Sequence, residues 1–428
     1  MKVIVTAAPV IGHLNPLLAI GRMLAEMGHE VVGYAPTVFR RNVETNGLRF
    51  HPYPPDADID TRDVVKMSRR SQGLPPGFPA LKLDWEQVFV ERMDAEYRGL
   101  QDLLREFPAD LILAESMTFS TMPLLTGPRA GRPAIIHVGV TFLQLSREDG
   151  APMFSGLPPA VSEKDRAANV DMFLHAKDEW FDPIDHMIND VLVANGCPVM
   201  PMPFYDAAIR LPDLFLQVGV PGLELPVFTL PASLHYIGAT APAPGLYPVP
   251  AWANELKGRR AVLVTQGTVA NANLDLLIGP TLEALAHEDD MIVIATTGGR
   301  PIETLGVLPD NARVAQFRPS DWLMPKLDLV ITNGGYGSVT HALSLGIPLV
   351  QAGTTEDKRE VAIRIATSGA GVALSTGEPT PLEIRAAVRQ VLNSRSYKLS
   401  AGALALEFHT YDVRRQIGPL IGKLTEAA

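Results

Sequence analysis

The chain has 428 residues, which is too long for one typical hydrophobic core and predicts two domains. Hydrophobic residues make up 46% and charged residues 20%, as in ordinary globular proteins, and a net charge of −10 argues against nucleic acid or an anionic membrane as the main partner. The single cysteine excludes an intrachain disulfide and a cysteine metal site, no apolar run is long enough to span a membrane, and we expect a cytoplasmic protein.

Short apolar runs bounded by turn residues predict the strands of the first half, at 3–7, 30–35, 110–114 and 133–138. Residues 8–14 should form a loop, and the first helix should begin at Pro16, with Asn15 as its N-cap, and end at Gly28. This alternation of strand, loop, helix and strand is typical of a parallel α/β sheet. The proline-rich stretch 51–80 is predicted to lie on the surface as a loop, and its alternating aspartates to be solvated rather than metal ligands.

Residues 142–212 are predicted to be irregular, and they contain many methionine and aromatic side chains. Such side chains suit an adaptable apolar pocket for a small molecule, and the alternative interpretation is a plain helical core. In the pocket interpretation, Phe142, Met153 and Phe173 would contact the small molecule, together with residues 60–95.

Residues 239–251 hold four prolines and no helical period, so they are the best candidate for a linker. After it, strands are predicted at 260–265, 291–295, 314–317 and 328–332. We therefore divide the chain into an N-terminal domain, a linker, a C-terminal domain and a final helix, at 1–238, 239–255, 256–404 and 405–428. Parallel α/β sheets bind ligands beyond the carboxyl ends of their strands, so the cleft between the domains is the expected site.

The stretch from Asp328 to Pro348 predicts a buried strand, a glycine-rich turn and a short helix with Ser338 as its cap and Gly346 at its end. A helix N-terminus presents unpaired N–H groups and the positive end of the helix dipole, which together bind anions. The alternative is an ordinary turn whose glycines allow close packing, and the glycines alone do not decide between the two.

His13 follows the first predicted strand, so it should lie at the carboxyl end of that strand and face the cleft. A histidine pKa near 6.5 suits a general base at neutral pH, and such a base needs an acid to orient its second ring nitrogen. Glu115 directly follows the strand 110–114 and should project into the same cleft, whereas Asp110 lies at the far end. The alternatives are a packing histidine and a solvated or structural carboxylate.

The chain resembles the UDP-glycosyltransferase family, and most of all its bacterial macrolide-glycosyltransferase type, in motifs that occur in the family's order: IGHLNPLLAIGRML at 11–24, QGT at 266–268, FRP at 317–319, ITNGGYGS at 331–338, GIPLV at 346–350 and EDK at 356–358. The resemblance covers nearly the whole chain. It implies the GT-B fold, an α/β architecture of two Rossmann-like domains that face each other across a cleft, with the C-terminal helix crossing back to the N-terminal domain. It also implies inverting sugar transfer without a metal or other cofactor, with the nucleotide sugar as co-substrate.

The resemblance further implies that His13 deprotonates the acceptor hydroxyl and that Glu115 stands where the family usually has an aspartate. The positions that would hold the donor are Gly12, Thr268, Phe317, Arg318, Asn333, Gly335, Gly337, Ser338, His341, Asp357 and Lys358. Among them, Phe317 would stack on the nucleotide base, Gly335 would lie against the diphosphate, and Asp357 would hold sugar hydroxyls.

This chain departs from the family pattern within the donor motifs. Asn333 replaces a phosphate-binding histidine, and His341 replaces a ribose-binding glutamate. Gly337 replaces an asparagine, and Lys358 replaces a glutamine. These changes leave the sugar and the nucleotide open, because a lysine at the sugar edge would accept a carboxylate or contact the phosphates.

The sequence therefore predicts an inverting glycosyltransferase of natural-product or antibiotic biosynthesis. It would move a sugar from a nucleotide diphosphate, with UDP favoured over dTDP, to a hydroxyl of an apolar small molecule such as a polyketide, macrolide or flavonoid-like compound. Two alternatives stay open: a GT-B epimerase or hydrolase acting on the nucleotide sugar, and a binding protein without activity, which the changes at Asn333 and His341 would suit. A monomer or a homodimer is expected, with no nucleic-acid partner.

Overall fold

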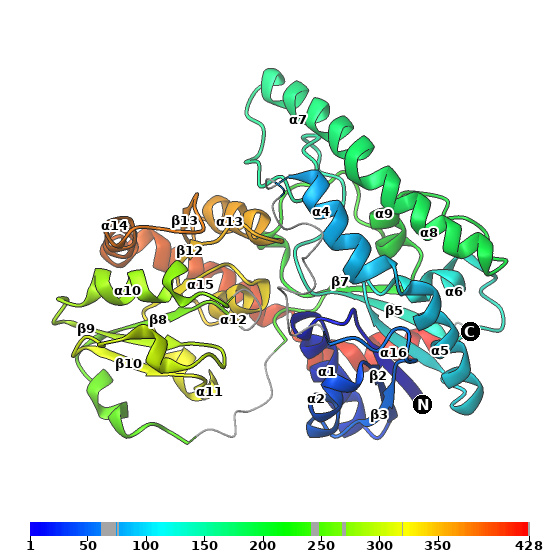
Figure 1. Cartoon of the computed structure of the whole chain (residues 1–428), viewed down its shortest axis with the longest axis horizontal. Helices are drawn as coiled ribbons and strands as arrows, with labels where there is room; N and C mark the ends of the chain where they lie inside the picture. The colour runs from blue at the N-terminus through cyan, green and yellow to red at the C-terminus, as the bar shows by residue number, and fades with distance from the viewer. Residues whose placement is uncertain (61–73, 75–76, 241–247, 268–270, 319, 427–428) are drawn as a thin grey trace.

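The computed structural model describes residues 1–60, 74, 77–240, 248–267, 271–318 and 320–426, and these form two β-sheets surrounded by helices (Figure 1). The first sheet has the strand order β3-β2-β1-β4-β5-β6-β7, with bounds β1 (Lys2–Thr6), β2 (Glu30–Ala35), β3 (Arg49–Pro52), β4 (Leu111–Glu115), β5 (Ala134–Gly139), β6 (Leu214–Gln217) and β7 (Leu234–Tyr236). The second has the order β10-β9-β8-β11-β12-β13, with bounds β8 (Arg260–Thr265), β9 (Met291–Thr296), β10 (Ala312–Ala315), β11 (Leu329–Thr332), β12 (Leu349–Ala352) and β13 (Gly371–Leu374). Neighbouring strands in both sheets run parallel, which confirms the predicted pair of α/β domains.

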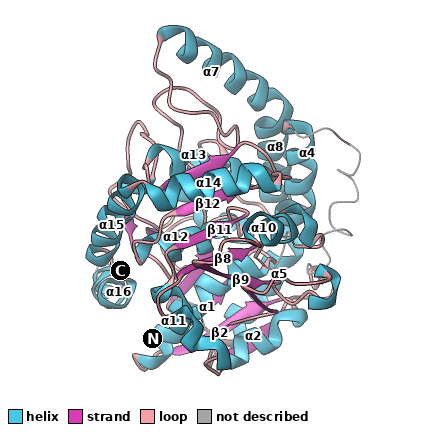
Figure 2. Ribbon diagram, turned by 90° about the vertical axis from the view of Figure 1, so that its left-hand side faces the viewer, coloured by secondary structure: helices cyan, strands magenta, loops and turns pink. Residues whose placement is uncertain are grey.

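The helices that precede the second sheet are α1 (Ile11–Glu26), α2 (Arg40–Thr45), α4 (Phe78–Trp85), α5 (Met93–Glu106), α6 (Met122–Thr126), α7 (Glu163–Ala176), α8 (Asp182–Ala194) and α9 (Phe204–Arg210). The later helices are α10 (Ile278–Leu285), α11 (Ser320–Leu323), α12 (Tyr336–Ser344), α13 (Lys358–Thr367), α14 (Pro381–Asn393), α15 (Arg395–Thr410) and α16 (Val413–Glu426). In Figure 2, strands β12, β11, β8 and β9 of the second sheet lie side by side among these helices.

Each sheet has one place where the order of its strands reverses. The reversal lies between β1 and β4 in the first sheet and between β8 and β11 in the second. Helices that follow two such strands leave toward opposite faces, so a crevice opens beyond the carboxyl ends of the two strands. The segments that follow β1, β4, β8 and β11 are therefore the ones that the fold places for binding.

The first helix begins earlier than the sequence predicts. We expected a loop over 8–14 and a helix from Pro16, but α1 begins at Ile11, and Pro16 lies inside it. Leu14 is buried, so the apolar face of the helix extends upstream of the proline. A proline near a helix N-terminus removes only one main-chain hydrogen bond there, and burial of that face outweighs the loss. His13 is consequently a residue of the first helical turn.

The prediction of an irregular segment over 142–212 was wrong for its second part. Helices α7 and α8 run through it, joined by a π-helical turn (Lys177–Phe181) in which Trp180 is fully buried. Several apolar residues of α7 face solvent, among them Val170 and Leu174, so the helix has no continuous apolar face to reveal it in the sequence. In Figure 1, α7 extends away from both sheets.

The final helix predicted over 405–428 is divided in two. Helix α15 ends at Thr410, and α16 begins at Val413 after a break at Tyr411 and Asp412. The Asp412 carboxylate accepts a hydrogen bond from the backbone N–H of Arg414, which starts the second helix. Helix α16, red in Figure 1, packs beside α1, and Arg414 lies 2.9 Å from Glu26 of that helix.

Other predicted segments fall partly outside the described residues. Of the proline-rich stretch 51–80, residues 61–73, 75 and 76 are not described, and α4 begins at Phe78. Of the predicted linker, residues 241–247 are not described, and a 3₁₀ turn follows at Ala251–Leu256. Within the described part of the chain, no helix is both long and apolar enough to cross a bilayer.

Candidate active site

The crevice of the first sheet contains the two residues predicted to act as base and orienting acid. Glu115 is the last residue of β4, and His13 lies in the first turn of the helix that follows β1. Strands β1 and β4 are hydrogen-bonded neighbours, so their carboxyl ends bring the two side chains together from distant parts of the sequence. Asp110 lies at the opposite end of β4, where it accepts a hydrogen bond from the N–H of Lys2, as the strand direction predicts.

The two side chains make a direct contact. The Nδ1 atom of His13 lies 3.3 Å from Oε2 of Glu115, whose side chain is fully buried, while 21% of the His13 side chain stays exposed. The other carboxylate oxygen, Oε1, accepts hydrogen bonds of 3.0 Å from the Ser116 hydroxyl and the Met117 N–H. Neither Nδ1 nor Oε2 has another hydrogen-bond partner in the described chain, so the carboxylate is anchored on one side and faces the imidazole on the other.

The surroundings of His13 favour its protonated form. Burial lowers the pKa of His13, but the Glu115 carboxylate outweighs this effect, and with a smaller contribution from Asp357 the pKa lies above 6.5. A second histidine, His137 on β5, is different: burial lowers its pKa to about 4, and its ring bonds to Thr121 and to a backbone carbonyl. The two histidines of this crevice therefore shift in opposite directions: the pKa of His13 is raised and that of His137 is lowered.

An aromatic ring lies beside the imidazole. The centre of the Phe89 ring lies 5.8 Å from that of the His13 ring, and the centre of the Trp85 ring lies 5.1 Å from that of Phe89. Phe89 belongs to a π-helical turn (Glu86–Val90) between α4 and α5. The sequence indicated residues 60–95 as part of a small-molecule site but did not single out Phe89, because a π turn has no helical or strand period to reveal it.

The three residues predicted to contact an apolar small molecule separate into two places. Met153 and Phe173 line a cavity of about 290 Å³, together with Tyr205 and Phe228 among others. Phe142 is instead almost fully buried at the boundary between the domains, where the guanidinium of Arg364 lies 4.5 Å from its ring. Phe142 therefore packs the two domains together and lines no part of that cavity.

The crevice of the second sheet contains the glycine-rich turn. Strand β11 ends at Thr332, Gly334 has a φ of 97°, and α12 begins at Tyr336 with Gly335 as its N-cap. Ser338, which we expected to be the cap, lies in the first helical turn, because the helix begins two residues before it. Gly346 ends the helix with a φ of 67°, as predicted.

The glycines of this turn have different surroundings. A side chain at Gly334 would meet the amide of Gln351 at 2.7 Å, so this glycine is required by packing and by its positive φ. A Cβ atom at Gly335 or Gly337 would have no atom within 4 Å, and the same is true of Gly12 in the facing domain. Gly335 is half-buried and Gly337 is exposed, so an anion can approach the helix N-terminus at these two residues.

Asn333 and His341 stand where the family pattern has a phosphate-binding histidine and a ribose-binding glutamate. The Asn333 side chain donates a hydrogen bond of 2.8 Å to the backbone oxygen of Gln266, so it braces the turn against the segment after β8. Burial lowers the pKa of His341, which keeps it neutral at physiological pH. Neither side chain brings a full positive charge to the glycine turn.

The residue predicted to stack on the nucleotide base, Phe317, lies in a loop and not in a strand. Strand β10 covers Ala312–Ala315 rather than 314–317, so Phe317 and Arg318 lie in the loop beyond it. Phe317 is 42% exposed, and its ring lies over Gly299. The Arg318 guanidinium packs 5.1 Å from the Trp252 ring and donates to the Val314 carbonyl, so it belongs to packing at the domain edge. The predicted donor residue Thr268 lies outside the described residues.

Asp357 joins the two half-sites. It lies at the N-terminus of α13 in the second domain, and its carboxylate accepts a hydrogen bond of 2.5 Å from the hydroxyl of Thr141 in the first domain. The same carboxylate is near enough to His13 to raise the histidine pKa. Its neighbour Lys358 is buried, which lowers its pKa to about 8, and pairs with Glu356. The sequence did not reveal Thr141, because its partner lies in the other domain.

The arrangement combines two chemical functions, one in each domain. An imidazole held by a buried carboxylate can accept a proton from a substrate hydroxyl. An open glycine turn at a helix N-terminus can bind an anion and stabilise a negative charge that develops there. Asp357 stands between them with an oxygen that can accept hydrogen bonds from a polar molecule in the cleft.

Comparisons with known proteins extend over the whole chain. Residues 280–412 match the family described as erythromycin biosynthesis protein CIII-like, C-terminal domain. 4'-Demethylrebeccamycin synthase of Lentzea aerocolonigenes is 34% identical over 413 residues, which cover 96% of each chain. UDP-glycosyltransferase 2 of Phaeomoniella chlamydospora is 35% identical over 444 residues, which cover 99% of this chain and 96% of its own.

Solved structures confirm the GT-B fold. The calicheamicin glycosyltransferase CalG4 matches with a TM-score of 0.74 at 18% identity, over 98% of each chain. The glycosyltransferase VinC, solved in complex with dTDP, matches with a TM-score of 0.71 at 18% identity, over the full length of both chains. At this level of identity the likeness concerns the fold alone.

Replacement of Glu115 by glutamine should lower the pKa of His13. The variant keeps the size of the side chain but removes the charge that opposes burial, so burial then dominates. The titration midpoint of the His13 ring, followed by NMR, should move to lower pH. His235 serves as an internal control, because its pKa is lowered by burial and by Lys423 and should not respond. An unchanged His13 midpoint would show that Glu115 does not govern this histidine.

Proposed function

The chain belongs to the UDP-glycosyltransferase family, in the macrolide-glycosyltransferase group of natural-product biosynthesis, and we propose that it transfers a sugar from a nucleotide diphosphate to a hydroxyl of an apolar small molecule. The main support is the contact of His13 with the buried Glu115 in the first domain, together with the glycine turn at the N-terminus of α12 in the second. The pair supplies a base, and the turn supplies a site for a leaving diphosphate.

The proposed reaction begins at the imidazole. Nδ1 of His13 faces Glu115, so Nε2 accepts the proton of the acceptor hydroxyl. The acceptor oxygen forms a bond to the anomeric carbon while the bond from that carbon to the diphosphate oxygen breaks. The electron pair of the broken bond leaves with the diphosphate, and attack from the opposite face inverts the anomeric configuration.

The donor would lie against the second domain. The backbone N–H groups at Gly335 and Gly337 would receive the diphosphate, because both residues lie at the N-terminus of α12 and the space beside them is open. The exposed ring of Phe317 would stack on the nucleotide base, and Asp357 would accept hydrogen bonds from the sugar hydroxyls. The buried Lys358 would contribute a positive charge at the sugar edge.

We propose UDP as the nucleotide and an apolar molecule as the acceptor. The relative that is 35% identical is named a UDP-glycosyltransferase, whereas VinC was solved with dTDP, so both nucleotides deserve a direct test. The acceptor would approach His13 along the Phe89 ring, and its more distant part would extend toward the cavity lined by Met153 and Phe173.

The proposal is tested by binding and turnover together. Thermal-shift measurements with UDP, dTDP and their sugars identify the nucleotide, because a ligand that binds only the folded state raises the melting temperature. Transfer is then measured with the stabilising sugar donor against a panel of aromatic and macrocyclic alcohols. Consumption of donor at full rate without acceptor would indicate an epimerase or hydrolase, and binding without any turnover would indicate a binding protein.

Replacement of His13 by alanine should reduce kcat by about 10²-fold to 10⁴-fold, the usual contribution of a general base. The thermal shift produced by the nucleotide should remain, because the nucleotide would bind the other domain. His409→Ala, on the exposed end of α15, is the matched control and should leave kcat unchanged. Turnover of His13→Ala at the rate of the wild-type enzyme would remove His13 from the mechanism.

The two adjacent glycines of the turn should respond differently to alanine. In Gly335→Ala the added methyl group enters open space where the diphosphate would lie, so the fold should be unaffected. Nucleotide affinity should fall by about 10-fold to 100-fold, the loss of one charge-assisted hydrogen bond of about 1.5–3 kcal/mol.

Gly334→Ala is the contrasting variant. Its positive φ and its contact with Gln351 should lower the melting temperature of the protein even without ligand. Differential scanning fluorimetry and calorimetric titration with the nucleotide separate the two effects. Full nucleotide affinity in Gly335→Ala would contradict a diphosphate at this turn.

A further inference from the structure

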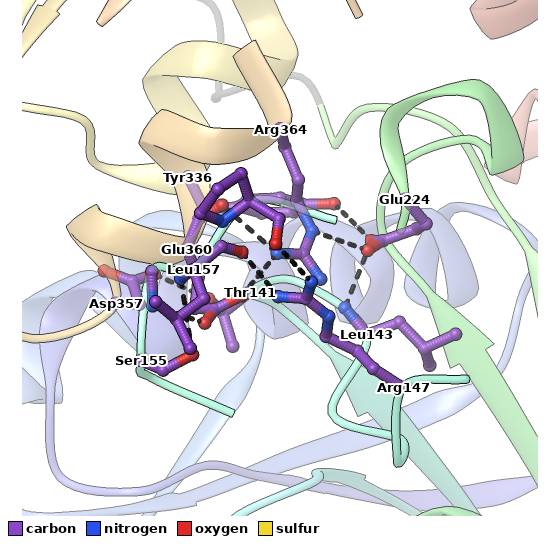
Figure 3. A network of polar contacts seen from close by, with 12 residues as sticks. Thr141, Leu143, Arg147, Ser155, Leu157, Glu224, Tyr336, Asp357, Glu360 and Arg364 are labelled. Atoms are coloured by element: carbon purple, nitrogen blue, oxygen red, sulfur yellow. Dashed lines mark hydrogen bonds and ion pairs between the residues drawn. The ribbon is translucent and has the colours of Figure 1, made fainter. Parts of the chain in front are cut away.

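The first residue of the donor helix is hydrogen-bonded to the opposite domain. Tyr336 begins α12 and is 3% exposed. Its hydroxyl lies 3.0 Å from the backbone oxygen of Val218 and 3.3 Å from Oε1 of Glu224, so it donates to groups that follow β6. Figure 3 shows Tyr336 and Glu224. The helix whose N-terminus would receive the diphosphate is thus attached to the domain that contains His13.

Glu224 continues this attachment to a second helix of the donor domain. Its Oε2 lies 2.8 Å from Nε of Arg364 on α13, and Nη1 of Arg364 lies 2.8 Å from Glu360. These three side chains are 5% exposed or less. Leu143 of the first domain donates its N–H to Glu224, and Gly156 donates its N–H to Glu360. We call Tyr336, Glu224, Glu360 and Arg364 the interdomain network; Figure 3 shows it converging from ribbons of both domains.

The contact of Tyr336 lies where the chain passes between the domains. Gly219, next to Val218, has a φ of 120°, and a Cβ atom there would lie 2.5 Å from the Tyr336 hydroxyl. Gly219 exchanges two backbone hydrogen bonds with Gly238, after which the chain leaves the first domain. A Cβ atom at Gly238 would in turn lie 1.8 Å from the Tyr411 oxygen, at the break where the chain returns. The Tyr336 hydroxyl therefore lies close to both segments that connect the domains. The absence of a side chain at Gly219 leaves the space that it occupies.

We propose that Tyr336 and Glu224 are positioning residues that hold the N-terminus of α12 at the pivot between the domains, so that the donor diphosphate keeps a fixed register with His13. This inference rests on the proposed function, because register matters only if the two half-sites act on one substrate pair. A point close to a pivot moves little when domains rotate, whereas the outer ends of the cleft move far. Because α12 is attached at the pivot, the domains can rotate apart to admit an acceptor while the diphosphate keeps its distance and direction relative to His13.

The first experiment removes the hydroxyl alone. Tyr336→Phe keeps the buried ring, and kcat should fall by about 10-fold to 100-fold, since a displacement on the order of 1 Å has that effect on positioned reactants. The donor KM and the nucleotide affinity should change less than about threefold, because phosphate contacts are made within the second domain. Tyr34→Phe is the matched control: its buried hydroxyl donates to a backbone oxygen within the first domain, and its loss should leave kcat unchanged.

A purely structural role would give a different result. It would lower the melting temperature of Tyr336→Phe and leave kcat of the folded fraction at the wild-type value, and that outcome would overturn the inference. Glu224→Gln keeps the shape and an acceptor for Leu143 but removes the charge facing Arg364, and kcat should fall again. The kcat of the double variant should fall no further than that of the more impaired single variant, because both changes break the same interdomain network. Multiplied losses would contradict a shared action.

Hydrogen exchange tests the attachment without any substrate. Peptides that span Leu143 and Gly219 should exchange faster in Tyr336→Phe than in the wild-type protein. Their exchange rates in Tyr34→Phe should equal those of the wild-type protein. Equal exchange in all three proteins would overturn the inference even if the enzyme transfers sugar normally. Wild-type protein that transfers no sugar but shows this exchange pattern would overturn the proposed function and leave the attachment established.

Discussion

The common direction of the strands in each parallel sheet is the constraint on which the site depends. All carboxyl ends of a parallel sheet lie at one edge, and helices that follow neighbouring strands diverge where the strand order reverses. In the first sheet this brings His13, after β1, to Glu115, at the end of β4. In the second it places the glycine turn after β11 against Gln266 after β8. The sequence needs only a few special residues in these turns, because the strand order of each sheet already places the turns at its crevice.

Features that depend on neighbouring residues could be predicted from the sequence, and features that depend on distant residues could not. The buried strands and the glycine turn are local patterns, and strand direction was enough to favour Glu115 over Asp110 as the partner of His13. The start of α1 was missed because Asn15 and Pro16 are a common helix start, while burial of Leu14 extends the helix beyond them.

Contacts between the domains have no local pattern at all. The Thr141 hydroxyl meets Asp357, and Glu224 meets Arg364, only after both domains have folded and docked. Arg318 is an example of a residue that lies in a recognisable motif but has a packing contact that the motif does not reveal. Its place in a motif suggested a donor contact, and the motif does not show that its guanidinium also packs 5.1 Å from the ring of Trp252. Motifs indicate which loops meet the cleft, and packing decides which side chains of those loops face it.

Buried charge explains why the domains can be held in one geometry. Removing ions from water costs more than their attraction returns, so a buried ion pair contributes little net stability compared with apolar packing. A buried ion pair does, however, destabilise every arrangement in which the two charges are separated and water cannot reach them. The pair therefore favours one relative position of the two segments that carry it. Arg364 lies between two carboxylates and over the Phe142 ring at the domain boundary, where an apolar contact alone would allow sliding. Placing the charge network there, rather than in either core, restricts the geometry that a two-domain transferase must control: the distance and angle between its two half-sites.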